Sequence, residues 1–453
     1  MKIRIIETDF SKKYFLKETL SEMTFNDVYV VEKKDKSGDL EYNIINIHPE
    51  CVYQSIIGIG GALTDASAYV ISQMDEKTKR RALDLLFSKK GANFNFLRIS
   101  INSCDFSKSF YSYVDDGDYS LISFDIGHDK EYLIPLLKRI KTINSDAKVL
   151  ASPWSAPAFM KTANSLIGGH LKDDCYDVWS RYIARFIESY LHNGVSVWGV
   201  TLQNEPRHQQ TWESCLFTQE EEQRLLNYLG KEMEGTDVKI LCYDHCRERI
   251  FEKSKFAFEN DTKKYCSGIA NHWYSGHFFD EVRAAKKAFP HLLQIATEGC
   301  VSDGNSGVKN NLSYAEGYAF DIINAFKNGL DGYLDWNLVL DENNGPFHNR
   351  PENRYVAAQI IYDRQKKVLN LEPHYFYMCH ISKFIESESQ VIGVGTYDSL
   401  LSTVAFKNKD GSLVLVALNN SDVDKKVAVR LNKYVYVDQI LSHSIKTYII
   451  NYL

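Results

Sequence analysis

Between residues 53 and 386 the sequence alternates short apolar runs of strand type with stretches of helical periodicity. The strand-type runs cover residues 55–59, 94–100, 148–152, 197–205, 238–241, 268–272, 292–298 and 332–336. The clearest helical stripe consists of Trp179, Tyr182, Ile183, Phe186, Ile187 and Tyr190. Because eight strand-type runs are each followed by a helical segment, the sequence predicts an α/β fold of the (β/α)8 type, a TIM barrel, rather than an open doubly wound sheet.

The two ends of the chain show a different pattern. Residues 1–45 alternate polar and apolar residues in short runs, such as 27–31 and 40–44, which is typical of hairpin strands. After residue 387 helical periodicity stops, and short strands are predicted at 391–394, 402–406, 413–418 and 447–450. We therefore expect a β-sandwich built from residues 1–45 and 387–453, appended to a barrel of residues 46–386.

Two glutamates end two of the predicted barrel strands. Glu205 closes the fourth run and is followed by Pro206, while Glu298 closes the seventh run and is followed by Gly299. Each alone could be a surface acid at a loop edge. In a TIM barrel, however, the carboxyl ends of the strands carry the chemistry. A pair of carboxyl groups at that rim is what hydrolysis of a glycosidic bond requires.

Composition excludes several other classes of function. A net charge of −6 argues against a nucleic-acid binder and against a protein that binds membranes through basic patches. Charged residues interrupt the first apolar runs, so we expect no signal peptide, no transmembrane segment and a cytoplasmic location. Nine scattered cysteines fit a reducing compartment, and Cys242, His245 and Cys246 have no second ligand pair, so no metal site is predicted.

Several motifs, in this order along the chain, resemble those of glycoside hydrolase family 30. They are the motifs around Asp65 (GIGGALTDA), Arg98 (LRISINSCDFS), Trp154 (LASPWSAP), Glu205 (TLQNEP), Tyr274 (HWY), Glu298 (TEGC) and Trp336 (DWNLVL). The resemblance covers nearly the whole chain and implies the same barrel with a β-sandwich from both termini. It also implies a β-glycoside substrate and no cofactor, because two carboxyl groups suffice for the reaction.

The resemblance assigns Glu205 as the general acid/base and Glu298 as the nucleophile. Two carboxyl groups about 5–5.5 Å apart repel each other when both are charged, so one keeps its proton and the other stays ionised. Asn204 is expected to donate to the sugar 2-hydroxyl. Arg98 is expected to keep Glu298 ionised; a surface position for this arginine fits poorly with its bulky, strand-forming neighbours.

Further sugar contacts follow from the same resemblance. Asp65 and Trp154 correspond to residues that hold the outer hydroxyls of a glucosyl unit, although Asp65 could instead cap the following helix. Trp336 corresponds to the aromatic platform beneath the −1 sugar, although a tryptophan on a buried strand is more often part of the core.

The remaining candidates lie near the nucleophile and in a variable loop. Tyr274 is expected to hydrogen-bond Glu298, with His272 supporting it from behind, although a lone histidine on an apolar strand is usually a core residue. Asn349 is expected to contact the sugar from the loop after the eighth strand. That loop and segment 207–217 shape the leaving-group side, so they leave the preferred leaving group open.

These observations favour a retaining β-glucosidase of the glucosylceramidase type that removes terminal β-linked glucose. The same chemistry with another specificity, a β-xylosidase, β-fucosidase or endo-β-1,6-glucanase, stays open. A non-catalytic sugar-binding protein is the third alternative, and the presence of both carboxylates argues against it. Sequence patterns alone predict no oligomeric state.

Overall fold

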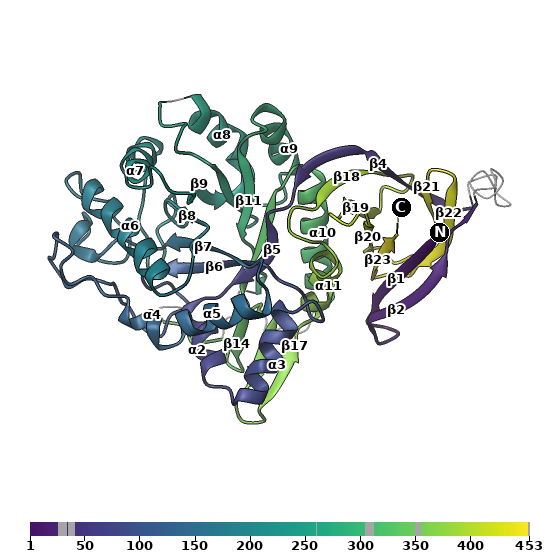
Figure 1. Ribbon diagram of the computed structural model, residues 1–453, viewed down its shortest axis with the longest axis horizontal. Coiled ribbons are helices and arrows are strands. Elements are labelled where there is room, and N and C mark those ends of the chain that lie inside the picture. The colour runs from purple at the N-terminus through teal and green to yellow at the C-terminus, as the bar shows by residue number, and fades with distance from the viewer. Residues whose placement is uncertain (26–33, 35–40, 260, 304–311, 349–354, 452–453) are drawn as a thin grey trace.

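The computed structural model describes residues 1–25, 34, 41–259, 261–303, 312–348 and 355–451. It consists of a barrel wrapped in helices and a separate β-sheet domain, which lie side by side (Figure 1). The N-terminal strands and the last strands of the chain meet in the β-sheet domain.

Eight parallel strands close the barrel in the order β5–β6–β7–β8–β9–β10–β11–β13. Their bounds are β5 (Gly58–Ala62), β6 (Phe96–Ile101), β7 (Lys148–Pro153), β8 (Gly199–Thr201), β9 (Lys239–Cys246), β10 (Gly268–His272), β11 (Leu293–Glu298) and β13 (Gly332–Asn337). Each strand overlaps one of the predicted apolar runs. The predicted TIM barrel is therefore confirmed.

Helices cover the outside of the barrel. They are α2 (Asp65–Ser72), α3 (Glu76–Phe87), α4 (Gly127–Glu131), α5 (Leu133–Ile143), α6 (Tyr176–His192), α7 (Gln219–Glu232), α8 (Ile250–Glu259), α9 (Phe279–Ala288), α10 (Leu312–Lys327) and α11 (Pro373–Ser382). Local sequence explains where they begin: Asp75 caps α3 by accepting from the Thr78 amide, and Thr218 with Glu221 forms a capping box on α7. The aromatic stripe of α6 is buried against the strands, as its periodicity predicts.

The inside of the barrel is packed with apolar side chains. One such residue from each of six strands forms this cluster: Phe96, Leu150, Leu241, Ala270, Ile295 and Leu334. Because apolar side chains fill the interior, a site is expected among the polar residues at the carboxyl ends of the strands.

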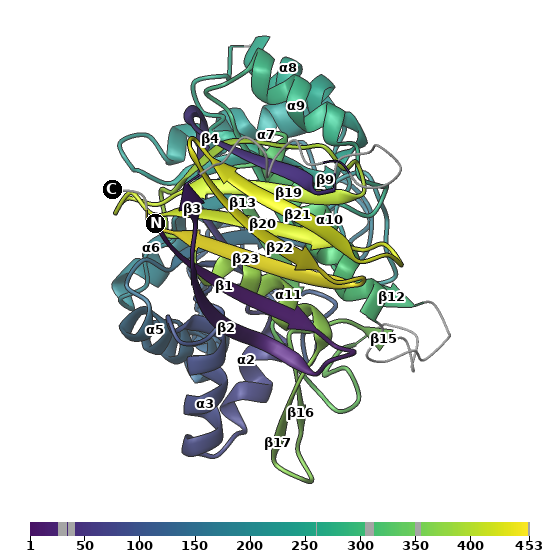
Figure 2. The same cartoon turned by 90° about the vertical axis from the view of Figure 1, so that its right-hand side faces the viewer.

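The second domain is a ten-stranded sheet in the order β2–β1–β23–β20–β19–β18–β4–β21–β22–β3 (Figure 2). Its strands are β1 (Lys2–Asp9), β2 (Tyr14–Glu22), β3 (Thr24–Phe25), β4 (Asn43–Ser55), β18 (Gln390–Thr396), β19 (Leu401–Lys407), β20 (Leu413–Asn419), β21 (Lys425–Leu431), β22 (Tyr434–Ile440) and β23 (Ser444–Ile450). One core cluster contains Ile3 and Leu415 from one half of this order and Val427 and Val429 from the other. Residues from both halves therefore face each other across one core, which confirms a β-sandwich built from both termini.

The sheet differs from the sequence-based expectation in three details. β4 stays paired with β18 as far as Ser55, so the chain enters the barrel later than the expected start at residue 46. β21 and β22 were not predicted, because exposed charged and polar residues interrupt their apolar positions. The predicted strand 27–31 lies outside the described residues.

Two helices join the domains. α10 and α11 lie between the barrel and the sheet (Figure 1). On α11, the buried ring of His380 hydrogen-bonds the hydroxyls of Thr8 on β1 and Thr447 on β23, both at 2.9 Å. The sandwich is thus fixed to the barrel by buried polar contacts as well as apolar packing.

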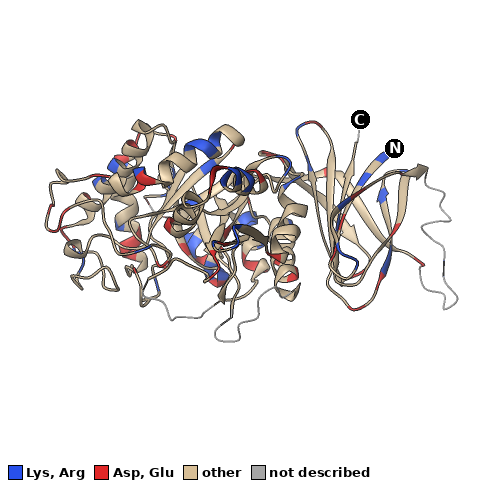
Figure 3. Cartoon of the chain, turned by 90° about the horizontal axis from the view of Figure 1, so that it is seen from below, with Lys and Arg blue, Asp and Glu red and all other residues tan. Residues whose placement is uncertain are grey.

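Short strands extend the barrel wall beside the eighth strand. β14 (Val339–Asp341), β16 (Ile360–Asp363) and β17 (Val368–Leu371) form one small sheet, and β12 (Ser302–Asp303) pairs with β15 (Tyr355–Val356). Acidic and basic residues are interspersed over both domains (Figure 3). Among the described helices, none combines the length and the apolar character needed to cross a bilayer.

Candidate active site

Glu205 and Glu298 lie together at the carboxyl ends of the barrel strands. Glu205 stands in the loop directly after β8, where its amide donates to the carbonyl of Asp244 at 2.9 Å, and Glu298 is the last residue of β11. One carboxylate oxygen of each lies within 4.8 Å of the other. This separation matches the short spacing of about 5–5.5 Å at which one carboxylate can attack the anomeric carbon directly.

The two oxygens of Glu298 have different donors. Arg98 donates from Nη1 to Oε2 at 2.6 Å, and the Tyr274 hydroxyl donates to Oε1 at 2.7 Å. Burial opposes the charge of Arg98, but the charges of Asp244 and Glu298 raise its pKa above the ordinary value. The paired guanidinium and the hydroxyl therefore hold Glu298 as an oriented carboxylate.

Arg98 also connects the other polar groups of the site. Its Nε donates to the Ser152 hydroxyl at 3.0 Å, and its Nη2 donates to Asn204 Oδ1 at 2.9 Å and to Asp244 Oδ2 at 2.8 Å. Because Oδ1 of Asn204 faces the guanidinium, its amide nitrogen is turned the other way and stays a donor for a ligand.

Glu205 is paired with His272, the last residue of β10. Glu205 Oε1 lies 3.2 Å from His272 Nδ1, and Oε2 accepts from Gln210 at 3.1 Å. Burial raises the pKa of Glu205, but the hydrogen bond and charge of His272 outweigh burial and lower it. Burial lowers the pKa of His272, but Glu298, Asp244 and Glu205 raise it above the ordinary value. The pair therefore retains a proton on the histidine side of this bond.

His272 packs against Tyr274, the neighbour that was expected, but its nitrogens face other residues. Its ring meets that of Tyr274 edge-on at 5.9 Å, while its two nitrogens face Glu205 and Asp244. The histidine thus acts on the Glu205 side of the site, and its contact with Tyr274 is one of packing.

Two tryptophans stack beside this network. Trp336 on β13 is stacked on Trp154, which follows β7, with ring centroids 5.3 Å apart and an interplanar angle of 25°. The Arg98 guanidinium lies 4.7 Å from the Trp154 ring centroid. Trp336 lines the open cavity, and Trp154 supports it from behind.

Asp65 is buried next to the site rather than open to it. Its Oδ1 accepts from the Tyr132 hydroxyl at 2.6 Å and faces His128 at 2.9 Å, while Oδ2 accepts from the Lys108 amide at 3.2 Å. The cap of α2 is Thr64, whose hydroxyl accepts from the Ser67 amide. Capping therefore does not explain Asp65.

A cavity of about 440 Å³ opens in front of the two glutamates. Its wall includes Glu205, Glu298, Tyr274 and Trp336, together with a polar outer part formed by Asp105, His208, Gln210, Trp212, His245, Glu248, Ser275 and Ser302. Of the sequence-predicted contacts, Asn349 lies outside the described residues.

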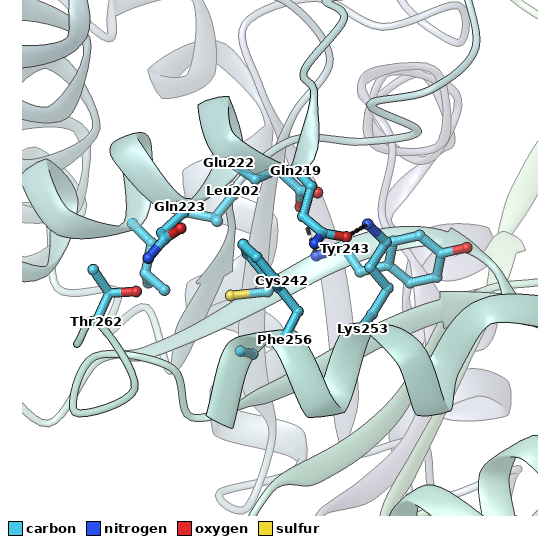
Figure 4. Close-up of a pocket in the computed structure, with 11 residues that line it drawn as sticks. Leu202, Gln219, Glu222, Gln223, Cys242, Tyr243, Lys253, Phe256 and Thr262 are labelled. Atoms are coloured by element: carbon cyan, nitrogen blue, oxygen red, sulfur yellow. Dashed lines mark hydrogen bonds between the residues drawn. The ribbon is translucent and has the colours of Figure 1, made fainter. Parts of the chain in front are cut away.

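Two features could be mistaken for other functional sites. Ligand atoms of Glu205, His272 and Glu298 lie within 4.8 Å of one another, but the Arg98 cation is 2.6 Å from Glu298 and His272 Nδ1 is engaged by Glu205, so the set does not fit a metal ion. A narrow pocket outside the barrel is bounded by Leu202, Cys242 and Phe256 and contains the buried Glu222 and Lys253 (Figure 4). It lies beside β9, against α7 and α8, and contains neither Glu205 nor Glu298.

Sequence patterns did not single out Asp244. This residue is fully buried near the end of β9 and contacts both Arg98 and His272. Its segment Cys242–Cys246 was considered only as a metal motif. The usable signal was its place at the end of the fifth strand, since polar residues at strand ends form the site of a TIM barrel.

A (β/α)8 barrel with two facing carboxylates at its carboxyl rim defines a glycoside hydrolase. The family models agree: residues 56–385 match the glycosyl hydrolase family 30 TIM-barrel domain, and residues 388–448 match the family 30 β-sandwich domain. The chain belongs to glycosyl hydrolase family 30.

Known proteins similar to this chain differ in substrate. Mouse lysosomal acid glucosylceramidase is 30% identical over 90% of this chain and 83% of its own length. An endo-1,6-β-D-glucanase of Trichoderma harzianum is 24% identical over 81% of this chain and 78% of its own. Among solved structures, SrfJ from Salmonella typhimurium has a TM-score of 0.92 and 31% identity over 100% of both chains. An endo-β1,6-glucanase has a TM-score of 0.87 and 25% identity over 99% of both.

Proposed function

We propose that this chain is a retaining β-glycosidase that releases terminal β-linked glucose by double displacement. The observation that carries the proposal is the separation of the two carboxylates, with oxygens of Glu205 and Glu298 within 4.8 Å of each other. An inverting enzyme needs its carboxyl groups roughly 6.5–9.5 Å apart, because a water molecule must fit beside the sugar.

In the first step, Glu298 attacks the anomeric carbon. Its two donors, Arg98 and Tyr274, hold the carboxylate so that one oxygen is aimed at the carbon. As the glycosidic bond breaks, the leaving oxygen takes the bond electrons together with a proton from Glu205, which shares its proton with His272. The product of this step is a glucosyl ester of Glu298.

In the second step, a water molecule replaces the leaving group. Glu205, now a carboxylate, accepts a proton from the water while the water oxygen bonds to the anomeric carbon. The ester bond to Glu298 breaks, and the carboxylate returns to its bonds with Arg98 and Tyr274. Two inversions leave the product with the configuration of the substrate.

The sugar-binding contacts follow from the geometry around this pair. Asn204 presents its amide nitrogen to the sugar 2-hydroxyl, since Arg98 holds its oxygen. Trp336, stacked on Trp154, gives the sugar ring a flat apolar surface. Asp65 is buried beside the site and bonded to Tyr132, His128 and the Lys108 amide, so a contact with the outer hydroxyls of glucose requires the sugar to replace one of these partners.

A second candidate is the same reaction on a β-1,6-linked glucan. The polar residues of the outer cavity, among them His208, Gln210 and Glu248, favour a hydrophilic leaving group such as a second sugar, and Trp212 offers a surface for it to stack on. This candidate agrees with the similarity to endo-1,6-β-glucanases.

The test is a substrate panel followed by ¹H NMR. The enzyme is incubated with an aryl β-glucoside, an aryl β-xyloside, an aryl β-fucoside, glucosylceramide, the β-1,6-linked disaccharide and a long β-1,6-glucan. The proposal expects hydrolysis of the aryl β-glucoside with β-glucose as the first product. First release of α-glucose, or no turnover of any glucoside, would overturn it. Release of oligosaccharides from the long glucan would favour the second candidate.

A further inference from the structure

Asp244 is a buried carboxylate that the backbone turns into the barrel. Tyr243 and Asp244 have φ values of +77° and +47°, in the left-handed region that residues other than glycine rarely adopt. In the pairing of β9 with β10, Ala270 is opposite Tyr243 and Asn271 is opposite His245, so Asp244 is the extra residue of a bulge. Strain of this kind is retained where the surrounding contacts demand it, often at functional sites.

Four groups converge on the two oxygens of Asp244. Oδ2 accepts from Arg98 at 2.8 Å and from the Thr201 hydroxyl at 2.6 Å, while Oδ1 accepts from the Thr297 hydroxyl at 2.5 Å and faces His272 Nε2 at 3.1 Å. Burial raises the pKa of Asp244, but Arg98 and these bonds lower it well below the ordinary value. Asp244 is therefore a charged acceptor, and Nε2 of His272 must carry a hydrogen.

Because Nε2 carries a hydrogen, the number of protons between Nδ1 of His272 and Glu205 is also fixed. His272 Nδ1 lies 3.2 Å from Glu205 Oε1. If Nδ1 is protonated, it donates to the Glu205 carboxylate; if it is not, the carboxyl group must be protonated and donate to Nδ1. In both cases one proton lies between Glu205 and His272.

We propose that Asp244 is a positioning residue for acid catalysis: by fixing the Nε2–H form of His272, it keeps on the His272–Glu205 bond the proton that the leaving group receives. This inference rests on the proposed acid/base role of Glu205. When the glycosidic bond breaks, this proton passes through the Glu205 carboxyl group to the leaving oxygen, and His272 is left neutral. When water attacks the glucosyl ester, Glu205 accepts a proton from it, and the proton returns to the same bond.

Asp244 reaches both halves of the site. Its carbonyl accepts from the Glu205 amide at 2.9 Å, and its side chain shares the guanidinium of Arg98 with Glu298. Its negative charge therefore balances Arg98, which would otherwise weaken the hold of the Glu205–His272 pair on its proton.

Other titratable groups also face the pair. They are Arg98, Glu298, Tyr274, Cys246 and His245. Burial lowers the pKa of His245 to about 4, so this histidine is neutral near pH 7. Gln210 adds a neutral bond to Glu205. Among the described residues, none of these groups hydrogen-bonds Nε2 of His272, so Asp244 sets its tautomer.

The experiment is Asp244→Asn, assayed with aryl and alkyl β-glucosides whose leaving groups differ in acidity. We expect the 2,4-dinitrophenyl glucoside, which needs no proton, to lose no more than about tenfold in kcat/KM. Poor leaving groups should lose about 10²–10⁴-fold, the contribution of general acid catalysis. The alkaline limb of kcat/KM should move to lower pH, because a negative charge that favours the proton is gone.

Asp321→Asn is the matched control. Asp321 on α10 is another fully buried aspartate with an arginine and a histidine partner, Arg247 at 2.8 Å and His277 at 3.1 Å, but it does not contact Glu205 or His272. We expect it to lower stability without any dependence on the leaving group and without moving the alkaline limb. If Asp244→Asn behaves like this control, the inference is wrong.

A second variant covers the case in which Asp244→Asn fails to fold. His272→Gln removes the proton carrier itself, so it should show the same dependence on the leaving group, and the double variant should lose no more than His272→Gln alone. Wild-type rates of His272→Gln on poor leaving groups would overturn the inference. Failure of the proposed function looks different: a Glu205→Ala variant would then show no dependence on the leaving group and no rescue by azide.

Discussion

Arg98 Nη1 donates to Glu298 Oε2 at a distance of 2.6 Å. The arginine is fully buried, and the glutamate is nearly so. An arginine in this position needs several acceptors, and Ser152, Asn204 and Asp244 supply them. The contact therefore belongs to a network that orients Glu298, the nucleophile of the proposed mechanism, and connects it through Asp244 to His272 and Glu205.

Two substitutions of Arg98 should distinguish the effect of its charge from the effect of its hydrogen-bond geometry. Arg98→Lys keeps the charge but cannot donate in four directions, so Glu298 and Asn204 lose their alignment and kcat should fall by about 10²-fold or more.

Arg98→Met also leaves two buried carboxylates without a cation, which should cost about 3–5 kcal/mol of unfolding free energy. Arg139→Met, in an exposed pair with Glu76, should cost no more than about 1 kcal/mol. Kinetics and urea unfolding check all three, and a wild-type kcat for Arg98→Lys would contradict the network.

The two glutamates should respond differently to azide. Glu298→Ala should abolish turnover of even an activated aryl glucoside, and azide in the vacated space should give the α-glucosyl azide by a single displacement. Glu205→Ala should still form the glucosyl ester from an activated substrate, lose about 10²–10⁴-fold on natural ones and give the β-azide. NMR of the azide products decides, and an α-azide from the Glu205 variant would reverse the two assignments.

Asp65 should act on glucose rather than on folding. Asp65→Ala should lower kcat/KM for aryl glucosides far more than for aryl xylosides, which lack the C6 hydroxymethyl group. Thr64→Val is the control, because Thr64 caps α2. It should cost about 0.5–2 kcal/mol of stability and affect both substrates alike. Equal losses on both substrates for Asp65→Ala would show that its bonds to Tyr132 and His128 are structural.

Three buried acids should stabilise the fold less as pH rises through neutrality. Burial raises the pKa of Glu222 and of Asp335 to about 7, and that of Asp129 to about 6. These groups bind protons more tightly in the folded state, so each stabilises the fold at acidic pH and loses that contribution between its ordinary pKa and the raised one. For Glu222 the loss is about 3 kcal/mol.

Thermal unfolding at pH 5 and pH 8 checks this prediction. The Tm of the wild type should exceed that of Glu222→Gln by less at pH 8 than at pH 5, since a glutamine cannot lose a proton but can still accept from the Tyr243 amide in the pocket of Figure 4. Glu220→Gln, on the exposed side of the same helix, should differ from the wild type by nearly the same amount at both pH values. An advantage of the wild type over Glu222→Gln that grows from pH 5 to pH 8 would contradict the expected direction.

Sequence patterns predicted the barrel well, because buried parallel strands are continuous apolar runs that length and spacing reveal. β21 and β22 were missed because their apolar runs are short: Lys425, Lys426 and Arg430 flank the run in β21, and Asp438 and Gln439 end the run in β22. The end of β4 was misplaced because that strand continues past the point where the apolar pattern of the sheet fades.

The candidate site shows the same division. Glu205 and Glu298 follow directly from runs that end in an acid. Asp244 does not, because its role depends on a β-bulge with left-handed backbone angles. No residue type in Cys242–Cys246 indicates such a bulge. The partners of the His272 nitrogens could not be predicted either, since Glu205 in the loop after β8 and Asp244 on β9 meet the ring only once the barrel has closed.

Covalent trapping tests the central claim most directly. A 2-deoxy-2-fluoro-β-glucosyl fluoride keeps a good leaving group but slows release of the intermediate, since it lacks the 2-hydroxyl that Asn204 is placed to bind. Peptide mass spectrometry should then find one fluoroglucosyl group on Glu298 and a time-dependent loss of activity. A label on Glu205, or an enzyme that hydrolyses glucosides yet never acquires a label, would contradict the double displacement through Glu298.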